Sequence, residues 1–351
     1  MDRPGRDLTA VFDGHNDALG ALQTADDPPE RFLTGLPERH IDLARARTGG
    51  LAGGLFAINA PSPSGDLKVD GSAWEESYAD PVDPADASIF TLGAVGRAHA
   101  LAAASDGAVA IVRSVEELDR ARASGALAIG LHLEGAEAIG PDLAALDAWY
   151  AAGVRSLGPV WSRANAFGHG VPFRFPSSPD TGPGLTEDGR RLVARCAELG
   201  IAVDLSHLNE AGFWDVARTL DGPLIASHSG VHALCTYSRN LTDDQLDAIG
   251  SSGGLVGINF DVGSLRADGG DDAETPVAKI AEHARYVADR IGPDHVALGS
   301  DFDGATMPAE LPDASRYPRV LAALEAAGFE GGELDRIASG NWRRVLAAAW
   351  G

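Results

Sequence analysis

The chain has 351 residues, and its 51 Asp and Glu against 28 Lys and Arg give a formal net charge of −23. This negative charge repels phosphate backbones and anionic lipid, so we expect no nucleic-acid partner and no membrane docking through basic residues. Hydrophobic residues make up 44% of the chain, which excludes a disordered protein and allows a large core.

Short apolar runs alternate with helical patterns along the chain. The predicted strands are Ala10–Asp17, Gly53–Asn59, Leu127–Glu134, Val154–Val160, Ile201–His207, Leu224–His228, Leu255–Phe260 and Val296–Asp301, with a short extra run at Ala108–Val112. The predicted helices include Val115–Ala123, Leu143–Ala152, Leu185–Leu199, Asp243–Ile249 and Val277–Ile291. Capping-box spacing marks two helix starts, at Ser114 with Glu117 and at Thr242 with Gln245.

Continuous apolar strands separated by helices are typical of a parallel sheet that is covered on both faces. Eight such strands favour an α/β fold of the (β/α)8, TIM-like barrel type, formed by residues 1–351 as a single domain. An open doubly wound sheet is the alternative, but no G-x-G-x-x-G motif follows the first strand. Two polar stretches, Pro61–Ala87 and Arg163–Gly184, follow strands and are predicted as long loops. They either cover the site or extend into solvent.

The first predicted strand ends with a histidine and a carboxylate on the same side. His15 and Asp17 are two residues apart, so on a strand their side chains point the same way. Imidazole nitrogen and carboxylate oxygen together can bind one divalent metal ion. A hydrogen-bonded pair in the core is the alternative.

The third long strand ends at Glu134, where a buried carboxylate must be paired or metal-bound. His132 shares its face, and a role as a core or supporting histidine is favoured over direct ligation. The next strands end in Ser-His pairs, and His207 and His228 could give two nitrogens to a second metal ion.

The last predicted strand ends at Asp301, where a general base could meet a metal-held water. Asp303 fits better as a residue that orders the turn at Gly304. In one barrel the strand-end residues converge, and they are His15, Asp17, Glu134, His207, His228 and Asp301. Two zinc-like ions about 3.5–4 Å apart would share a water, lower its pKa and polarise a carbonyl, which predicts amide or ester hydrolysis. Manganese or iron would fit the same donor atoms.

At this point several motifs, taken together and in chain order, resemble the renal (membrane) dipeptidase family of zinc metallopeptidases, within the amidohydrolase superfamily. They are Asp13-Gly-His-Asn-Asp17, Glu134-Gly135, Asp204-Leu-Ser-His207, Ser227-His-Ser229, Ser238-Arg-Asn240 and Asp301-Phe-Asp-Gly304. The resemblance runs from Phe12 to Val345, so it covers nearly the whole chain. It implies a (β/α)8 barrel with a binuclear zinc site and cleavage of dipeptides by a metal-bridging hydroxide.

The resemblance also implies a role for each matching residue. One zinc would be held by His15 and Asp17, the other by His207 and His228, and Glu134 would bridge them. Arg239 would hold the C-terminal carboxylate of the substrate through a bidentate contact. Asp301 would take a proton from the water and pass it to the leaving amine. No lysine lies near a predicted strand end, which disfavours the carboxylated-lysine bridge of other superfamily members.

One position departs from the family pattern. Trp161 stands where family members place a histidine that contacts the reacting carbonyl oxygen. An indole donates one N–H but cannot carry positive charge towards an oxyanion. Trp161 is therefore predicted to wall the substrate pocket, and His169, in a glycine-flanked loop, is either the replacement or an ordinary loop residue. His132 is a second candidate for that role.

The leading hypothesis is a zinc dipeptidase that accepts short peptides with a free C-terminus, including a D-residue there, as the family does. The alternatives are a metal-dependent hydrolase of N-acyl amino acids, lactones or β-lactams on the same barrel, and a non-catalytic binding barrel. A homodimer is expected only from the resemblance.

The cellular location is expected to be cytoplasmic. The two cysteines, Cys196 and Cys235, exclude a disulfide scaffold and favour a reducing compartment. Met1 to Ala10 lacks the apolar run of a secretory signal, and no stretch approaches about 18 consecutive apolar residues, so we expect no signal and no membrane span.

Overall fold

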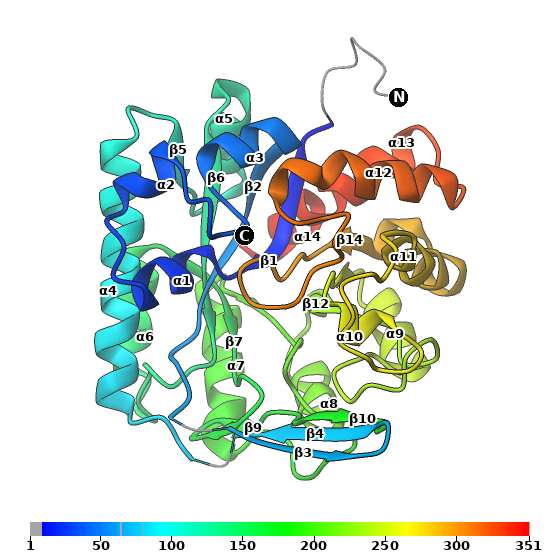
Figure 1. The fold of residues 1–351 in the computed structure, drawn as a ribbon. Helices are drawn as coiled ribbons and strands as arrows, with labels where there is room; N and C mark the ends of the chain where they lie inside the picture. Colours follow the sequence, from blue (N-terminus) through cyan, green and yellow to red (C-terminus); the bar gives the residue numbers. More distant parts are fainter. Residues whose placement is uncertain (1–8, 64, 79, 351) are drawn as a thin grey trace.

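The computed structural model describes residues 9–63, 65–78 and 80–350, and has helices arranged around parallel strands (Figure 1). Residues 1–8, which carry most of the expectation about a secretory signal, lie outside the described part. The larger parallel sheet has the order β1-β2-β6-β7-β11, with β5 paired to β6. Its strands are β1 Val11–Asn16, β2 Leu51–Ile58, β5 Val109–Ile111, β6 Leu127–Glu134, β7 Val154–Gly158 and β11 Ala202–Val203.

A second parallel sheet contains β12 (Ile225–Ser229), β13 (Leu255–Ile258) and β14 (Val296–Leu298), in that order. Isolated parallel bridges connect the two sheets at both junctions, between Asn16 and Phe302 and between Asp204 and Ile225. The α/β class is therefore confirmed, and the larger sheet forms a parallel half-barrel. All eight long strand predictions match strands, although β11 and β14 end earlier than expected.

Helices follow most strands, and all five predicted helices are confirmed within two residues at each end. The α-helices are α1 Ala18–Thr24, α2 Glu30–Thr34, α3 Leu43–Gly49, α4 Pro84–Ala104, α5 Val115–Ser124, α6 Ala144–Ala152, α7 Glu187–Leu199, α8 Glu210–Thr219, α9 Asp243–Ser251, α10 Val262–Leu265, α11 Ala278–Ile291, α12 Tyr317–Ala326, α13 Gly332–Asp335 and α14 Asn341–Ala349. Thr242 and Gln245 form the expected reciprocal capping box. Ser114 caps α5, but the Glu117 carboxylate accepts from Arg113 N instead of completing a box.

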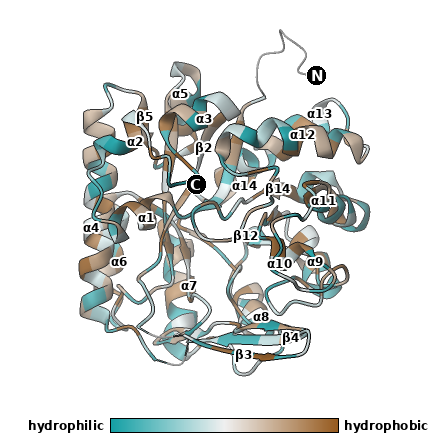
Figure 2. Ribbon diagram, viewed as in Figure 1, coloured by the Kyte–Doolittle hydropathy of each residue, from teal (hydrophilic) through white to brown (hydrophobic). Residues whose placement is uncertain are grey.

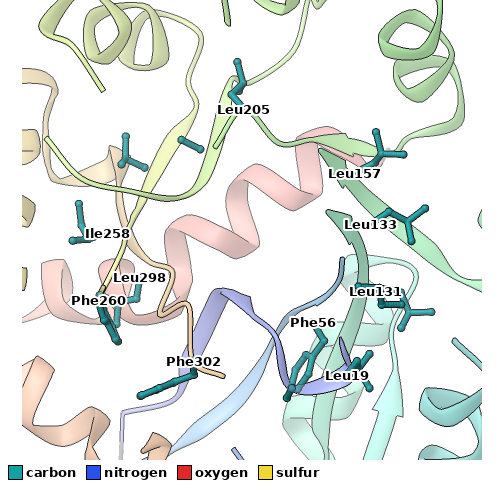
Figure 3. Close-up of a cluster of buried hydrophobic side chains, with 14 of the residues drawn as sticks. Leu19, Phe56, Leu131, Leu133, Leu157, Leu205, Ile258, Phe260, Leu298 and Phe302 are labelled. Atoms are coloured by element: carbon teal, nitrogen blue, oxygen red, sulfur yellow. The ribbon is translucent and has the colours of Figure 1, made fainter. Parts of the chain in front are cut away.

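Two-residue alternation places apolar and polar side chains of β6 on opposite faces. Leu131 and Leu133 belong to the main core, whereas His132 and Glu134 point to the other face. In Figure 3 the leucines of β6 and β7 lie at the right of the view and Ile258 with Phe260 at the left, with strands between the two groups, and all belong to the main core. The helices pack their apolar faces against the strands. Helix α11 is an example, and its exposed residues are hydrophilic in Figure 2. Apolar contacts to the helices therefore leave the other strand face free for polar residues.

A separate apolar cluster lies beneath the polar residues. It takes one buried residue from each of seven strands, including Phe12, Ala128 and Ala297, and adds the C-terminal helix α14. Trp342 of that helix donates from Nε1 to the Leu298 carbonyl at 3.0 Å. A Cβ on Gly14 would lie 2.2 Å from the Trp342 ring, so glycine is required between Asp13 and His15. The packing of Trp342 against Gly14 therefore fixes the backbone position of the neighbouring His15.

Both predicted long loops contain strands, which corrects the sequence-based expectation. Residues 61–87 include the hairpin β3 (Asp66–Asp70) and β4 (Ala73–Ser77), together with the first turn of α4. The other stretch supplies β8 (Ala164–Asn165), β9 (Gly168–His169) and β10 (Phe173–Phe175), and β10 pairs with β4. The β3–β4–β10 sheet lies at the bottom of the view in Figure 1, beyond the ends of the parallel strands. These short strands were not predicted because their segments are rich in proline, glycine and acidic residues, which are typical of loops.

Helix α4 bears on the expectation that the chain has no membrane-spanning helix. Among the described residues it is the one helix that is long and apolar enough to cross a membrane, by length and composition alone. A third of its most apolar window is buried, and α4 packs against α1, α2 and β5. Core helices pass the same test, so this is weak evidence for a span.

His283 on α11 braces the segment that follows β12. Its Nδ1 accepts from Val231 N at 3.0 Å, and its Nε2 lies 3.2 Å from the Leu265 carbonyl, so the buried ring is neutral and uses both nitrogens. Burial lowers the pKa of His283 to about 4, from an ordinary value of 6.5. Between these two values the unfolded chain binds the extra proton, so the stability that neutral His283 provides falls as the pH drops from 6.5 towards 4.

We therefore expect His283→Gln to be less stable than the parent at pH 7 but less sensitive to acid. The pKa difference corresponds to about 3 kcal/mol of pH-dependent stability at most. Urea unfolding at pH 7, 5.5 and 4.5 measures this, because groups common to both proteins cancel in the difference between them. Parallel stability curves for parent and variant would contradict the assignment.

Candidate metal centre

A cavity of about 760 Å³ opens where the carboxyl ends of the parallel strands meet. Its floor holds five of the strand-end residues, namely Asp17, Glu134, His207, His228 and Asp301. The β3–β4 hairpin contributes Trp74 and Glu76 to the same cavity, and Tyr78, directly after β4, also lines it. His15 lies fully buried directly beneath, with its Nε2 within 4.0 Å of carboxylate oxygens of Asp17, Glu134 and Asp301. The structure therefore brings all six strand-end residues together.

His207 and His228 point the same ring nitrogen at one place. Their Nε2 atoms are 3.1 Å apart, and Glu134 Oε1 lies 2.8 Å from the first and 3.6 Å from the second. In a tetrahedral site with Zn–N bonds of about 2.0–2.1 Å, two nitrogen ligands lie about 3.3 Å apart. These three side chains therefore have the spacing of ligands to one metal ion.

Glu134 also belongs to a second group of potential ligands. His15 Nε2 lies 3.5 Å from Glu134 Oε1 and 3.6 Å from Asp17 Oδ2. Both nitrogens of the fully buried His15 lack a hydrogen-bond partner among the described residues. Such orphaned polar atoms are costly in a protein interior, and a bound cation would satisfy Nε2. The donor set therefore fits a divalent metal ion on both sides of Glu134.

Serine hydroxyls orient the two cavity histidines. Ser227 Oγ donates to Asp204 Oδ2 at 2.5 Å, so it must accept from His228 Nδ1 at 2.8 Å. This leaves the Nε2 lone pair of His228 facing the cavity, as a metal ligand requires. Ser162 Oγ lies 2.8 Å from His207 Nδ1 and can hold that ring in the same tautomer.

The electrostatics of the protein groups alone favour a bound cation. Burial raises the pKa of Glu134 to about 8 and, with a further contribution from the charge of Asp17, raises that of Asp301 to about 6. Burial alone would lower the pKa of His15, but the charges of Glu134 and Asp17 outweigh it and raise that pKa to about 10. Burial lowers the pKa values of His207 and His228 well below 6.5, so both are neutral ligands.

Asp301 is held in an unusual conformation at the cavity wall. Its φ is +62°, in the left-handed region that residues other than glycine rarely adopt, and such strain is frequent at functional sites. Asp301 N donates to the His15 carbonyl at 3.0 Å, and Asn259 Nδ2 donates to Asp301 Oδ2 at 3.0 Å. Asp303, also at positive φ, accepts from His40 N through Oδ1, so its side chain connects the turn to a distant segment, and the turn is closed by Gly304 N donating to the Asp301 carbonyl at 3.0 Å.

Arg239 lies at the cavity wall beside the histidines and is only 7% exposed. Its Nη2 donates to the His228 carbonyl at 3.3 Å and lies 3.3 Å from His207 Nε2. Its Nη1 is buried without a hydrogen-bond partner among the described residues. A buried guanidinium with an unused donor is suited to a carboxylate ligand.

Of the two residues that the sequence suggested for the substrate pocket, Trp161 lines the cavity and His169 does not. Trp161 lines the cavity, with its ring centroid 5.7 Å from that of His207 and 4.7 Å from that of Tyr78. His169 is not among the cavity-lining residues, and its Nδ1 lies 3.1 Å from the Gly184 carbonyl. His132 is fully buried behind the site, where its Nδ1 lies 2.9 Å from Ser156 Oγ.

Sequence reasoning missed several residues that shape the site. The aromatic residues Trp74, Tyr78, Phe173 and Tyr237 line the cavity next to Trp161, and Ser162, Ser227 and Asn259 orient the polar groups. The paired Ser-His strand ends carried a signal for Ser227. Trp74, Tyr78 and Phe173 come from the two segments predicted as loops, and Tyr237 directly precedes the Ser238-Arg-Asn240 motif, so no local spacing indicates that the four converge.

A mixed α/β fold with buried histidines and carboxylates at the strand ends indicates a metal-dependent hydrolase. Comparison with known proteins identifies the family. The family model described as membrane dipeptidase (peptidase family M19) matches residues 7–350. The chain therefore belongs to the membrane dipeptidase family, whose members are metallopeptidases, and it is a peptide-bond hydrolase.

Three relatives illustrate the similarity. The crystal structure described as dipeptidase AC, a metallo peptidase, is 44% identical, with a TM-score of 0.92 over 98% of this chain and 100% of that chain. A metallo peptidase from Rhodobacter sphaeroides, solved with a phosphinate mimic of the dipeptide L-Ala-D-Ala, is 43% identical with the same TM-score and coverage. An uncharacterized protein in the pqqA 5' region of Klebsiella pneumoniae is 48% identical over 250 residues, which are 71% of this chain and 92% of that protein.

The serine that orients His228 gives a direct test of the metal centre. We expect Ser227→Ala to weaken divalent-metal binding about 10- to 100-fold, because the ring loses the acceptor that fixes its tautomer. Competition titration with a chelator measures the metal affinity. Ser229→Ala is the matched control, since Ser229 Oγ is buried without a partner among the described residues. Equal affinities in Ser227→Ala and Ser229→Ala would contradict this role.

Proposed function

We propose that this chain is a binuclear zinc dipeptidase, built as a single domain on a closed (β/α)8 barrel. The observation that carries the proposal is the position of Glu134 Oε1, which lies 2.8, 3.5 and 3.6 Å from Nε2 of His207, His15 and His228. One carboxylate thus belongs to both ligand groups. The parallel bridges at both sheet junctions support closure of the barrel.

The ligand types suit zinc on both sides of the bridge. His15 and Asp17 would hold one ion, His207 and His228 the other, and Glu134 would join them. When bound, two such ions lower the pKa of a shared water and polarise the substrate carbonyl. Manganese and iron accept the same nitrogen and oxygen donors, so the preference for zinc is part of the proposal.

The chain's own residues would bind the peptide and move its protons. The unused Arg239 Nη1 would take the C-terminal carboxylate of the substrate and set the register of the scissile bond. Asp301, whose pKa is raised to about 6 by burial, would accept a proton from the attacking water and donate it to the leaving nitrogen. Asn259 supports this, because its bond to Oδ2 leaves Oδ1 free to face the cavity.

A dipeptide with a C-terminal D-residue is the preferred substrate class. The Rhodobacter sphaeroides relative was solved with a mimic of L-Ala-D-Ala, which supports this class for a chain 43% identical to it. Trp161 is the reason to assay N-acyl amino acids, lactones and β-lactams beside a dipeptide library. The cytoplasmic location and the homodimer stay predictions.

Removal of the bridge tests the metal dependence. We expect chelation to abolish dipeptide hydrolysis and added Zn²⁺ to restore it. Glu134→Ala should retain less than two metal ions per chain and lose nearly all activity, because the carboxylate shared by both ligand groups is gone. Metal analysis and a dipeptide assay on one sample measure both effects. Unchanged activity after chelation or in Glu134→Ala would overturn the proposal.

Arg239→Met tests recognition of the free carboxylate. Methionine keeps an unbranched apolar stem but offers no donor, so we expect KM for dipeptides to rise about 10- to 100-fold, the worth of a lost charge-assisted contact. Dipeptides with an amidated C-terminus are the matched substrates. Their KM should differ little between parent and variant. A similar loss for both substrate types would indicate that Arg239 does not hold the carboxylate.

A further inference from the structure

Arg163 connects three loops at the rim of the cavity. Its side chain is 1% exposed, and its Nε lies 3.0 Å from Glu137 Oε1 in a buried ion pair. Its Nη1 donates to Ser62 Oγ at 2.8 Å, and its Nη2 donates to the Ala60 carbonyl at 2.9 Å and to Asn59 Oδ1 at 3.1 Å. The loops after β2, β6 and β7 are therefore held by one guanidinium.

This contact fixes the orientation of the Asn59 amide. A guanidinium has donors only, so the Asn59 atom that faces it must be the oxygen. The amide NH2 group must then point the other way. Asn59 lines the cavity, and its Nδ2 forms no hydrogen bond with another described residue. Arg163 thus leaves an oriented, unused donor at the cavity wall.

The strand register places this donor beside the bridging carboxylate. In the parallel pair β2–β6, Ile58 lies opposite Leu133, and both side chains belong to the main core. Continuing this register by one residue sets Asn59 beside Glu134, and both residues line the cavity. Neighbouring strands are about 4.8 Å apart, so Asn59 is one strand away from the proposed metal bridge.

We propose that Asn59 Nδ2 donates a hydrogen bond to the oxygen of the reacting carbonyl, and so stabilises negative charge in a cavity whose wall residue Trp161 cannot carry positive charge. The inference rests on the proposed dipeptidase function. An asparagine amide can serve as an oxyanion donor because its dipole is oriented before the reaction and it need not change protonation state. Arg163 is the positioning residue, since it touches Asn59 and not the substrate.

The donor acts during formation and collapse of the tetrahedral intermediate. The water oxygen bonds to the carbonyl carbon, the C=O π electrons move to the oxygen, and Asp301 takes the water proton. The new oxyanion accepts the Asn59 hydrogen bond, and Asn59 transfers no proton. On collapse the electron pair re-forms C=O, the C–N bond breaks, and Asp301 returns the proton to the leaving nitrogen.

Two substitutions separate this role from a structural one. Asn59→Asp keeps an oxygen for Arg163 and removes the NH2 donor, but adds charge. Asn59→Leu has similar volume, removes the donor and adds no charge. We expect both to lower kcat about 10²-fold with a small change in KM, the cost of losing one oxyanion donor. Inhibition by a phosphinate dipeptide mimic, which resembles the tetrahedral intermediate, should weaken in parallel.

The outcomes are distinguishable with metal content measured in every sample. Ser62→Ala is the matched control, because it removes another Arg163 contact and should retain parental kcat. Full activity in Asn59→Asp with loss in Asn59→Leu would reduce Asn59 to an anchor for Arg163 and overturn the inference. Loss only in Asn59→Asp would assign the effect to charge and also overturn it. Absence of dipeptidase activity in the metal-loaded parent would instead refute the proposed function.

Discussion

The site depends on a carboxylate buried among three histidines. Glu134 is 3% exposed, and an isolated charge at such a position carries a large desolvation cost. This cost appears in the pKa of Glu134, which burial raises to about 8 when only protein groups surround it. Two neutral imidazoles, His207 and His228, cannot compensate a negative charge. Among the protein groups, positive charge near Glu134 comes from His15, whose pKa is raised to about 10, and from Arg239. A bound metal ion would take over this compensation and leave His15 neutral as a ligand, which couples metal binding to the charge state of the cavity floor.

Two further buried carboxylates hold the elements that carry the ligands. Asp13 accepts from Ser300 N and Ser300 Oγ, both at 2.7 Å, and so connects β1 to the segment with Asp301. Asp204 accepts from Ser227 N at 2.8 Å and from Ser206 Oγ at 2.8 Å, and so connects β11 to β12. These are the two junctions between the parallel sheets, where backbone pairing is reduced to isolated bridges. Side-chain carboxylates thus connect the sheets where ladder bonds are few, and they also hold the segments that carry the proposed metal ligands.

The parts of this site that could be read from the sequence are those with a local pattern. An apolar strand that ends in His15, Glu134 or His228 violates the expected burial rule, and the parallel topology brings such ends together. The hairpin β3–β4 had no comparable pattern, since β3 is fully exposed and β4 only half-buried. Its contribution to the cavity depends on pairing with β10, about 100 residues away, a contact that no local spacing encodes.

The same distinction applies to the oxyanion donor that the family resemblance leads us to expect near Trp161. The sequence suggested a histidine nearby, His169, because residue type was the only available criterion. In the folded chain that residue lies against the Gly184 carbonyl, while Asn59, about 100 residues earlier, lies next to Glu134 through strand register. The NH2 group of Asn59 is oriented because Arg163 donates a hydrogen bond to the amide oxygen. The function of such a residue comes from its neighbour, and the neighbour is known only from the fold.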